Sequence, residues 1–264
     1  MKNYALLFLF LCSVNAAWAQ TGISVSPPRL YFETEPGKSV TDRITVTNVS
    51  VKNSLDLAVS LGDWAYDEKG ENITHPAKTL PSSCAGWLTV KKEDTYMSLA
   101  PGEKKEIEIT LTVPEKKTDN LQTHTALFYI TQMNPVNDVD SKGANIKVSI
   151  RSGIKVFHHY PSGNLRKLEM DDLKYMAESG SLLVTFSNTG NTWADGKMFA
   201  DLINTGTGKK TVIEPVVFYT MPGNRRQMQL QLPPALEKGS YTASVMLDYG
   251  EADALEVGEL NFTK

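Results

Sequence analysis

Hydrophobic and polar residues alternate with a period of two along most of the chain, and a helical period is hard to find. Two clear runs are Leu55, Leu57, Val59 and Leu61, and Ile107, Ile109, Leu111 and Val113. Such alternation is typical of strands that bury one face. Turn signals such as Glu35-Pro36-Gly37-Lys38 and Ala100-Pro101-Gly102-Glu103 separate the runs. The pattern therefore predicts an all-β protein with the spacing of a β-sandwich.

The length of the chain predicts two such sandwiches. One sandwich takes about 100 residues, and the chain has 264. The best break is at residues 158–163, where Pro161 and Gly163 stop the strand pattern. We expect an N-terminal domain at residues 21–159 and a C-terminal domain at 161–264. The last strand of the first domain is expected to run without interruption from Ile146 to Phe157.

The first 19 residues have the pattern of a cleaved signal peptide. Lys2 precedes a short apolar run, and Ala17-Trp18-Ala19 has the small residues of a cleavage site. The apolar run is shorter than the ~20 residues that span a bilayer, and no later stretch approaches that length. We therefore expect an exported, soluble protein that does not span a membrane. Cleavage would remove Cys12 and leave Cys84, interpreted as a semi-buried small apolar residue.

Charge and motif content argue against nucleic-acid binding and against catalysis. The chain has 27 Lys and Arg against 30 Asp and Glu, a net charge of -3, so it lacks the basic footprint that nucleic acids require. The four histidines show no metal-ligand spacing and are interpreted as surface or turn residues. There is no nucleophile elbow and no phosphate-binding loop. We expect no metal, no cofactor and no enzymatic activity.

Two segments break the rule of apolar residues inside and polar residues outside. Arg29 lies within an otherwise apolar first strand, and Lys155 lies near the domain boundary. Ile146, Val148 and Ile150 form an aliphatic row of one parity, and Lys155 has the opposite parity unless Gly153 introduces a bulge. Taken alone, Arg29 could pair with a turn carboxylate and Lys155 could be a solvated strand end. On pattern alone, an aliphatic row of this kind is more often sandwich core than a binding surface.

Taken in order along the chain, these segments resemble the PapD-like periplasmic chaperones of the chaperone–usher pilus pathway. The residues that carry the resemblance are Arg29-Leu30-Tyr31-Phe32, Gly37-Lys38-Ser39, Ile44-Thr45-Val46-Thr47-Asn48, Trp87-Leu88, Leu99-Ala100-Pro101-Gly102, Val113-Pro114, Leu127-Phe128-Tyr129-Ile130 and Ile154-Lys155-Val156-Phe157. The resemblance covers nearly all of the first domain and fades in the second.

The resemblance implies two immunoglobulin-like domains in a boomerang arrangement with a cleft between them. It also implies that Arg29 and Lys155 hold the C-terminal carboxylate of a fimbrial or pilus subunit. Ile146, Val148 and Ile150 would fill the subunit's incomplete core by donor-strand complementation. An outer-membrane usher is a further partner that the family suggests. The sequence departs from the family where His158 and His159 replace a basic residue, and in extra residues at 63–83.

Two other functions remain open from the sequence. A secreted structural or adhesive protein of two immunoglobulin-like domains would have the same strand pattern, with Arg29 and Lys155 incidental. An exported carbohydrate-active enzyme would need a cleft with paired carboxylates, and the sequence shows none.

Overall fold

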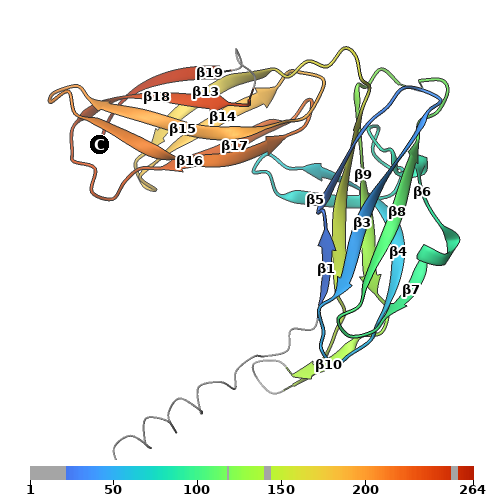
Figure 1. The fold of residues 1–264 in the computed structure, drawn as a ribbon. Helices are drawn as coiled ribbons and strands as arrows, with labels where there is room; N and C mark the ends of the chain where they lie inside the picture. Colours follow the sequence, from blue (N-terminus) through green and yellow to red (C-terminus); the bar gives the residue numbers. More distant parts are fainter. Residues whose placement is uncertain (1–21, 118, 140–143, 251–254) are drawn as a thin grey trace, which may run out of the picture.

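The computed structural model describes residues 22–117, 119–139, 144–250 and 255–264 as strands, turns and two short 3-10 helices, Ala85–Trp87 and Lys92–Asp94. The expected signal peptide, residues 1–19, lies outside the described residues. Within the described part of the chain, no helix is long and apolar enough to cross a membrane. The strands build two sandwiches, which confirms the predicted all-β class (Figure 1).

The first sandwich packs a four-stranded sheet against a larger one. The first sheet has the order β1 (Ile23–Ser26), β3 (Ser39–Asn48), β8 (Lys104–Thr112) and β6 (Leu88–Val90). The larger sheet has the order β2 (Arg29–Glu33), β12 (Arg151–His159), β9 (Thr123–Gln132), β4 (Leu55–Tyr66) and β5 (Asn72–Pro76), and β7 (Tyr96–Leu99) pairs with β4. A separate hairpin joins β10 (Val136–Val139) and β11 (Asn145–Val148).

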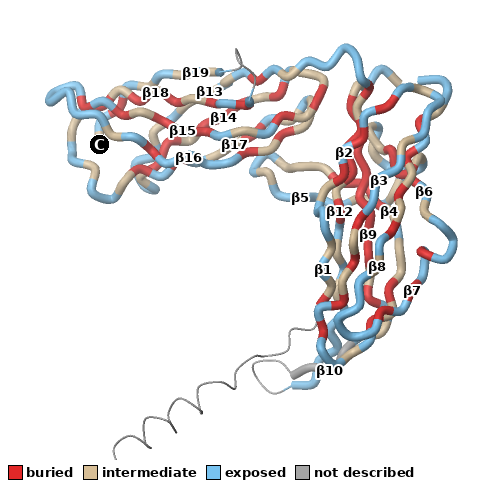
Figure 2. The backbone as a smooth tube through the Cα atoms, in the orientation of Figure 1, coloured by how far each residue is buried: buried red, intermediate tan, exposed pale blue. Residues whose placement is uncertain are grey.

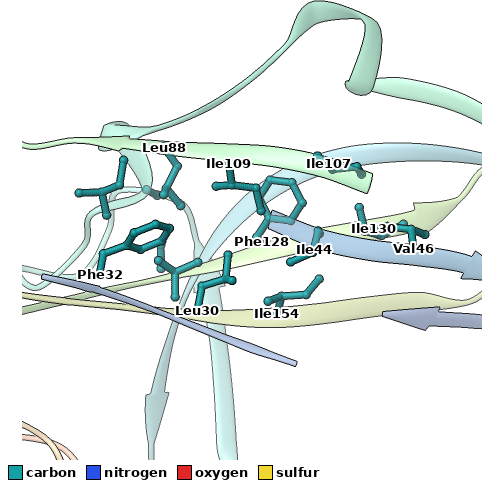
Figure 3. Close-up of a cluster of buried hydrophobic side chains, with 14 of the residues drawn as sticks. Leu30, Phe32, Ile44, Val46, Leu88, Ile107, Ile109, Phe128, Ile130 and Ile154 are labelled. Carbon is teal, nitrogen blue, oxygen red and sulfur yellow. The ribbon is translucent and has the colours of Figure 1, made fainter. Parts of the chain in front are cut away.

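The alternating residues of the sequence form the core between these two sheets. Successive side chains of a strand point to opposite faces, so every second residue enters the core. Figure 3 shows the result, with buried side chains that include Leu30, Phe32, Ile44, Val46, Ile107, Ile109, Phe128, Ile130 and Ile154. Each such side chain contributes about 1.5–3 kcal/mol when fully buried. Cys84 belongs to the same core and is fully buried, and burial raises the pKa of its thiol.

The long strand expected from Ile146 to Phe157 is interrupted. β11 ends at Val148 and β12 begins at Arg151. Hydrogen bonds to Gln132 stabilise the interruption. The main-chain N–H of Gln132 donates to the Ile150 carbonyl at 2.8 Å, and its carbonyl accepts from Ser149 Oγ at 2.5 Å. β11 therefore leaves the large sheet and pairs with β10 instead. Figure 1 places this hairpin at the end of the first sandwich farther from the second.

The second sandwich repeats the two-sheet plan with a core of its own. One sheet has the order β13 (Leu168–Met176), β14 (Ser181–Asn188) and β17 (Arg225–Gln231). The other has the order β16 (Lys210–Thr220), β15 (Ala194–Asn204), β18 (Ser240–Asp248) and β19 (Leu255–Thr263). Its buried residues include Leu182, Val184, Phe186, Met198, Leu202, Phe218, Val245 and Leu247.

The two sandwiches point in different directions and give the molecule the expected bent, two-armed shape (Figure 1). Buried positions concentrate along the inner strands of each arm (Figure 2). A third apolar cluster lies where the arms meet, with Trp64 and Phe157 from the first sandwich and Trp193 from the second. The Phe157 ring centroid is 5.3 Å from those of both tryptophans. Aromatic packing of this kind holds the junction together.

Candidate functional site

The fold brings Arg29 and Lys155 together, although 126 positions separate them in the sequence. β2 and β12 are parallel neighbours, and Arg29 is directly paired with Lys155 in their register. The next pair, Leu30 and Val156, is buried in the first core. Because side chains alternate along a strand, Arg29 and Lys155 lie together on the outer face of the sheet, at the junction.

Lys155 is half-buried and makes its contacts with aromatic rings and neutral oxygens. Its ammonium Nζ lies 4.0 Å from the ring centroid of Trp64 and 4.2 Å from that of Tyr66. The ammonium donates hydrogen bonds to Tyr66 Oη at 2.9 Å and to Asn72 Oδ1 at 2.5 Å. Burial, assisted by the charge of Arg29, lowers the pKa of Lys155 to about 8. The ammonium is therefore still mostly charged near pH 7. The two oxygens that accept its hydrogen bonds are neutral, so they do not cancel this charge.

Arg29 reaches across the junction to the second sandwich. Its guanidinium carbon lies 4.2 Å from the ring centroid of Tyr219, a β16 residue. The space that Arg29 lines together with Tyr31, Tyr66 and Trp193 has a volume of only ≈ 10 Å³. That is about the room one water molecule needs. Asp195 is the single acidic residue lining it, and no ion pair joins a carboxylate of the described residues to Arg29 or Lys155.

A third cation, Arg226 of β17, was not identified from the sequence. Its side chain is 4% exposed. Its guanidinium donates to the Tyr219 carbonyl at 2.7 Å and to the Lys69 carbonyl at 3.2 Å. The main-chain N–H of the next residue, Gln227, donates to the Glu68 carbonyl at 2.7 Å. The tip of the β4–β5 hairpin, within the unexplained 63–83 segment, is thus bonded to the second sandwich.

The predicted aliphatic row lies apart from the two cations. Ile146 and Val148 of β11 are 39% and 37% exposed, and Ile150 is half-buried in the break between strands. Among the described strands, β11 pairs only with β10, so its other edge is open. A fully extended chain between positions 148 and 155 would span about 23 Å, at about 3.3 Å per residue. The exposure of Ile146 and Val148 argues against the alternative that they are sandwich core.

Two of the four histidines are buried, so their interpretation as surface or turn residues was wrong. His124 and His158 are 1% and 0% exposed, and their ring centroids lie 5.6 Å apart. Burial lowers the pKa of both, that of His158 to about 4. Near pH 7 both rings are therefore neutral. His158 shares the parity of Ile154 and Val156 in β12, a sequence signal that would have placed it inside. No group of three potential ligands that could hold a metal ion occurs among the described residues.

Comparison with known proteins finds similarity at the level of solved structures. No family model matches the chain, and no curated protein does. The YadV chaperone is 14% identical, with a TM-score of 0.45 and coverage of 91% of this chain and 99% of that one. The E. coli chaperone DraB is 15% identical, with a TM-score of 0.46 and coverage of 91% and 98%. The Salmonella enterica structure of the SafA pilin with the SafB chaperone is 14% identical, with a TM-score of 0.45 and coverage of 94% and 99%.

Proposed function

We propose that this protein is a periplasmic chaperone that binds and caps secreted fimbrial or pilus subunits. In this proposal, Arg29 and Lys155 anchor the C-terminal carboxylate of the subunit in the junction between the sandwiches. β11 pairs with the subunit as an added strand, by donor-strand complementation. The observation that carries the proposal is the register pairing of two cations, Arg29 and Lys155, on one outer face without a carboxylate partner in the described chain.

A carboxylate is the ligand that fits two such cations. Leaving water costs an anion its hydration, and charge-assisted donors replace it. Arg29 would contribute a planar fork of N–H groups, and Lys155 a compact charge. Since burial already lowers the pKa of Lys155 to about 8, a negative charge beside it would be favourable for both partners. Both cations lie on the outer face of the first sandwich, at its junction with the second.

The row on β11 would supply the apolar part of the interface. An exposed strand edge offers unpaired main-chain N–H and C=O groups to a second chain. Alternate side chains of the added strand then enter pockets of the partner, which is how strand addition obtains specificity. Ile146 and Val148 are exposed, as such a role requires, and Ile150 would extend the row toward β12. No nucleotide or metal is needed for this binding, and an outer-membrane usher would be a second partner.

Periplasmic capture with charge-reversal variants tests the proposal. The tagged mature protein should bring down a small β-rich secreted subunit, and Arg29→Glu and Lys155→Glu should each lose it. Breaking one partner of a buried charge pair costs about 2–5 kcal/mol of binding free energy. Lys104→Glu is the matched control, because Lys104 is exposed on β8 and its reversal should leave capture unchanged.

Capture without the anchors would overturn the assignment. If the folded Arg29→Glu and Lys155→Glu variants retain the partner, the carboxylate site is wrong. If the wild-type protein captures no subunit, the structural or adhesive interpretation becomes the better one. A second pair of variants tests the donor row. Val148→Asp should weaken capture of the subunit, whereas Val51→Asp should not, since Val51 is 69% exposed and outside the row.

A further inference from the structure

One rung of the β4–β5 hairpin provides both oxygen acceptors of the Lys155 ammonium. Tyr66 and Asn72 are paired in the register of β4 and β5. Tyr66 Oη lies 2.9 Å and Asn72 Oδ1 lies 2.5 Å from Lys155 Nζ. The hairpin therefore presents two oxygens to one ammonium. A bound carboxylate would likewise present two oxygens.

The two acceptors differ in how freely they can leave. Tyr66 is half-buried and belongs to the junction cluster with Trp64. Asn72 is exposed at the start of β5. An exposed side chain changes rotamer readily, on the picosecond-to-nanosecond scale. Asn72 is thus the acceptor that an incoming group can replace at the smaller cost.

The backbone of the hairpin, in contrast, is held in place. Its tip is bonded to β17 through the Glu68 and Lys69 carbonyls. Gly70 has a φ of 86°, and a Cβ there would lie 1.9 Å from the Arg226 guanidinium, so Arg226 packs directly on this glycine. The hairpin cannot simply swing away while these contacts persist. Access to Lys155 then depends on a side chain rather than on the strand.

We propose that Asn72 Oδ1 is a surrogate ligand, which occupies on Lys155 the place of one carboxylate oxygen until a chain end with a free carboxylate displaces it. This inference rests on the proposed carboxylate anchor and adds to it the residue that the ligand must replace. Asn72 is a positioning residue that holds the ammonium in the unliganded protein.

Two substitutions at one position give opposite expectations. Asn72→Asp places a permanent carboxylate beside the Lys155 ammonium. This carboxylate should compete with the carboxylate of the ligand and weaken its binding. If the new ion pair forms in about nine molecules of ten, the apparent affinity for the ligand falls about tenfold. Asn72→Ala removes the competitor, so binding should be unchanged or tighter. A merely structural role for Asn72 would weaken binding in both variants.

The test uses the full mature chain and a short synthetic peptide of alternating valine and threonine, prepared with a free C-terminal carboxylate and with a C-terminal amide. Peptide affinity is measured for wild type, Asn72→Ala, Asn72→Asp, Lys155→Glu and Asn261→Asp. Asn261 is an exposed β19 residue whose Oδ1 accepts from Thr242, so Asn261→Asp controls for the added charge. The pKa of Lys155 is measured in parallel by NMR of its ε position. The charge of Arg29 and the hydroxyl of Tyr66, which also face the ammonium, are the same in every Asn72 variant.

The expected result is a carboxylate-dependent affinity that falls in Asn72→Asp and persists in Asn72→Ala and Asn261→Asp. The pKa of Lys155 should rise in Asn72→Asp, because an opposite charge favours the ammonium. Equal losses in both Asn72 variants, with Lys155→Glu also inactive, would overturn the surrogate and leave the anchor intact. Equal binding of the free and amidated peptides to wild type would overturn the anchor and the surrogate together.

Discussion

The cations of the first sandwich have two contrasting environments. On the outer face of the four-stranded sheet, Arg43 and Lys91 both lie 2.8 Å from carboxylate oxygens of Glu108, exposed to solvent. At the junction, Arg29 and Lys155 face aromatic rings and neutral oxygens instead. Arg43 and Lys91 are thus paired with a carboxylate, whereas among the described residues no ion pair reaches Arg29 or Lys155. This difference supports our proposal that a carboxylate from outside the chain binds at Arg29 and Lys155.

Replacing Trp64 should have the largest effect, because the junction depends on its aromatic packing. Trp64 is 2% exposed, its Nε1–H donates to the Ala126 carbonyl at 3.0 Å, and its ring lies under Lys155. Trp64→Ala should lower the free energy of unfolding by about 3–5 kcal/mol, measured by urea denaturation. The exposed variant Lys91→Ala should change it little. Similar losses in both would show that the junction is not the more strongly stabilised region.

Acid should destabilise the junction end of the first sandwich through His158. Its pKa is about 4 in the folded protein, against about 6.5 in an unfolded chain. The unfolded state therefore binds the proton first as the pH falls, and stability is lost from about pH 6.5 down to about pH 4. The loss should be on the order of 3 kcal/mol.

His158→Gln should flatten this pH dependence, because an amide N–H can still donate to the Thr34 carbonyl, which lies 3.1 Å from His158 Nε2, without titrating. The measurement is the unfolding midpoint in urea between pH 4 and pH 7. An unchanged pH profile in His158→Gln would assign the acid sensitivity to another group.

Arg226→Ala should loosen the bond between the hairpin and the second sandwich. It leaves the Tyr219 and Lys69 carbonyls without their donor, which costs about 1–3 kcal/mol of stability. Small-angle scattering should show a wider spread of angles between the arms. Arg43→Ala, which removes only an exposed ion pair, is the matched control and should leave the scattering profile unchanged. An unchanged profile in Arg226→Ala would mean that the aromatic cluster alone sets the angle.

Raising the pH should weaken ligand binding at Lys155 while it stabilises the fold. The folded-state pKa is about 8, below the usual value of about 10.4, so the unfolded state binds more protons between these values and stability rises with pH there. Binding of a carboxylate needs the ammonium and should fall about tenfold per pH unit above 8. Peptide affinity between pH 7 and pH 9.5 tests this. A flat profile would contradict the role of Lys155.

Alternation allowed the all-β class to be predicted, because strand parity decides which residues are buried, and chain length indicated two sandwiches. The face of Lys155 was left open, because a bulge at Gly153 would have changed its parity. Two strands of the second sandwich, β13 and β19, are only weakly marked by alternation in the sequence. Leu168–Met176 and Leu255–Thr263 carry several charges, and each has only one fully buried position, so their burial pattern barely shows in the sequence.

The site itself was only partly predictable. The family resemblance pointed to Arg29 and Lys155 as the site, which stays a prediction. Their direct pairing depends on parallel strands from opposite ends of the first domain. Tyr66, Asn72 and Arg226 act through contacts between distant segments, and no local pattern marks them. The break at Ser149 and Ile150 depends on hydrogen bonds to Gln132, which alternation alone does not reveal.

Zero-length carbodiimide crosslinking of the captured complex tests the central claim most directly. The reagent joins a carboxylate to an amine only where the two are in contact, and mass spectrometry identifies the joined peptides. We predict a crosslink between Lys155 Nζ and the C-terminal residue of the captured subunit, which is absent from the Lys155→Arg variant. A captured subunit whose C-terminus is joined only to other lysines, with Lys155 unmodified, would contradict the account.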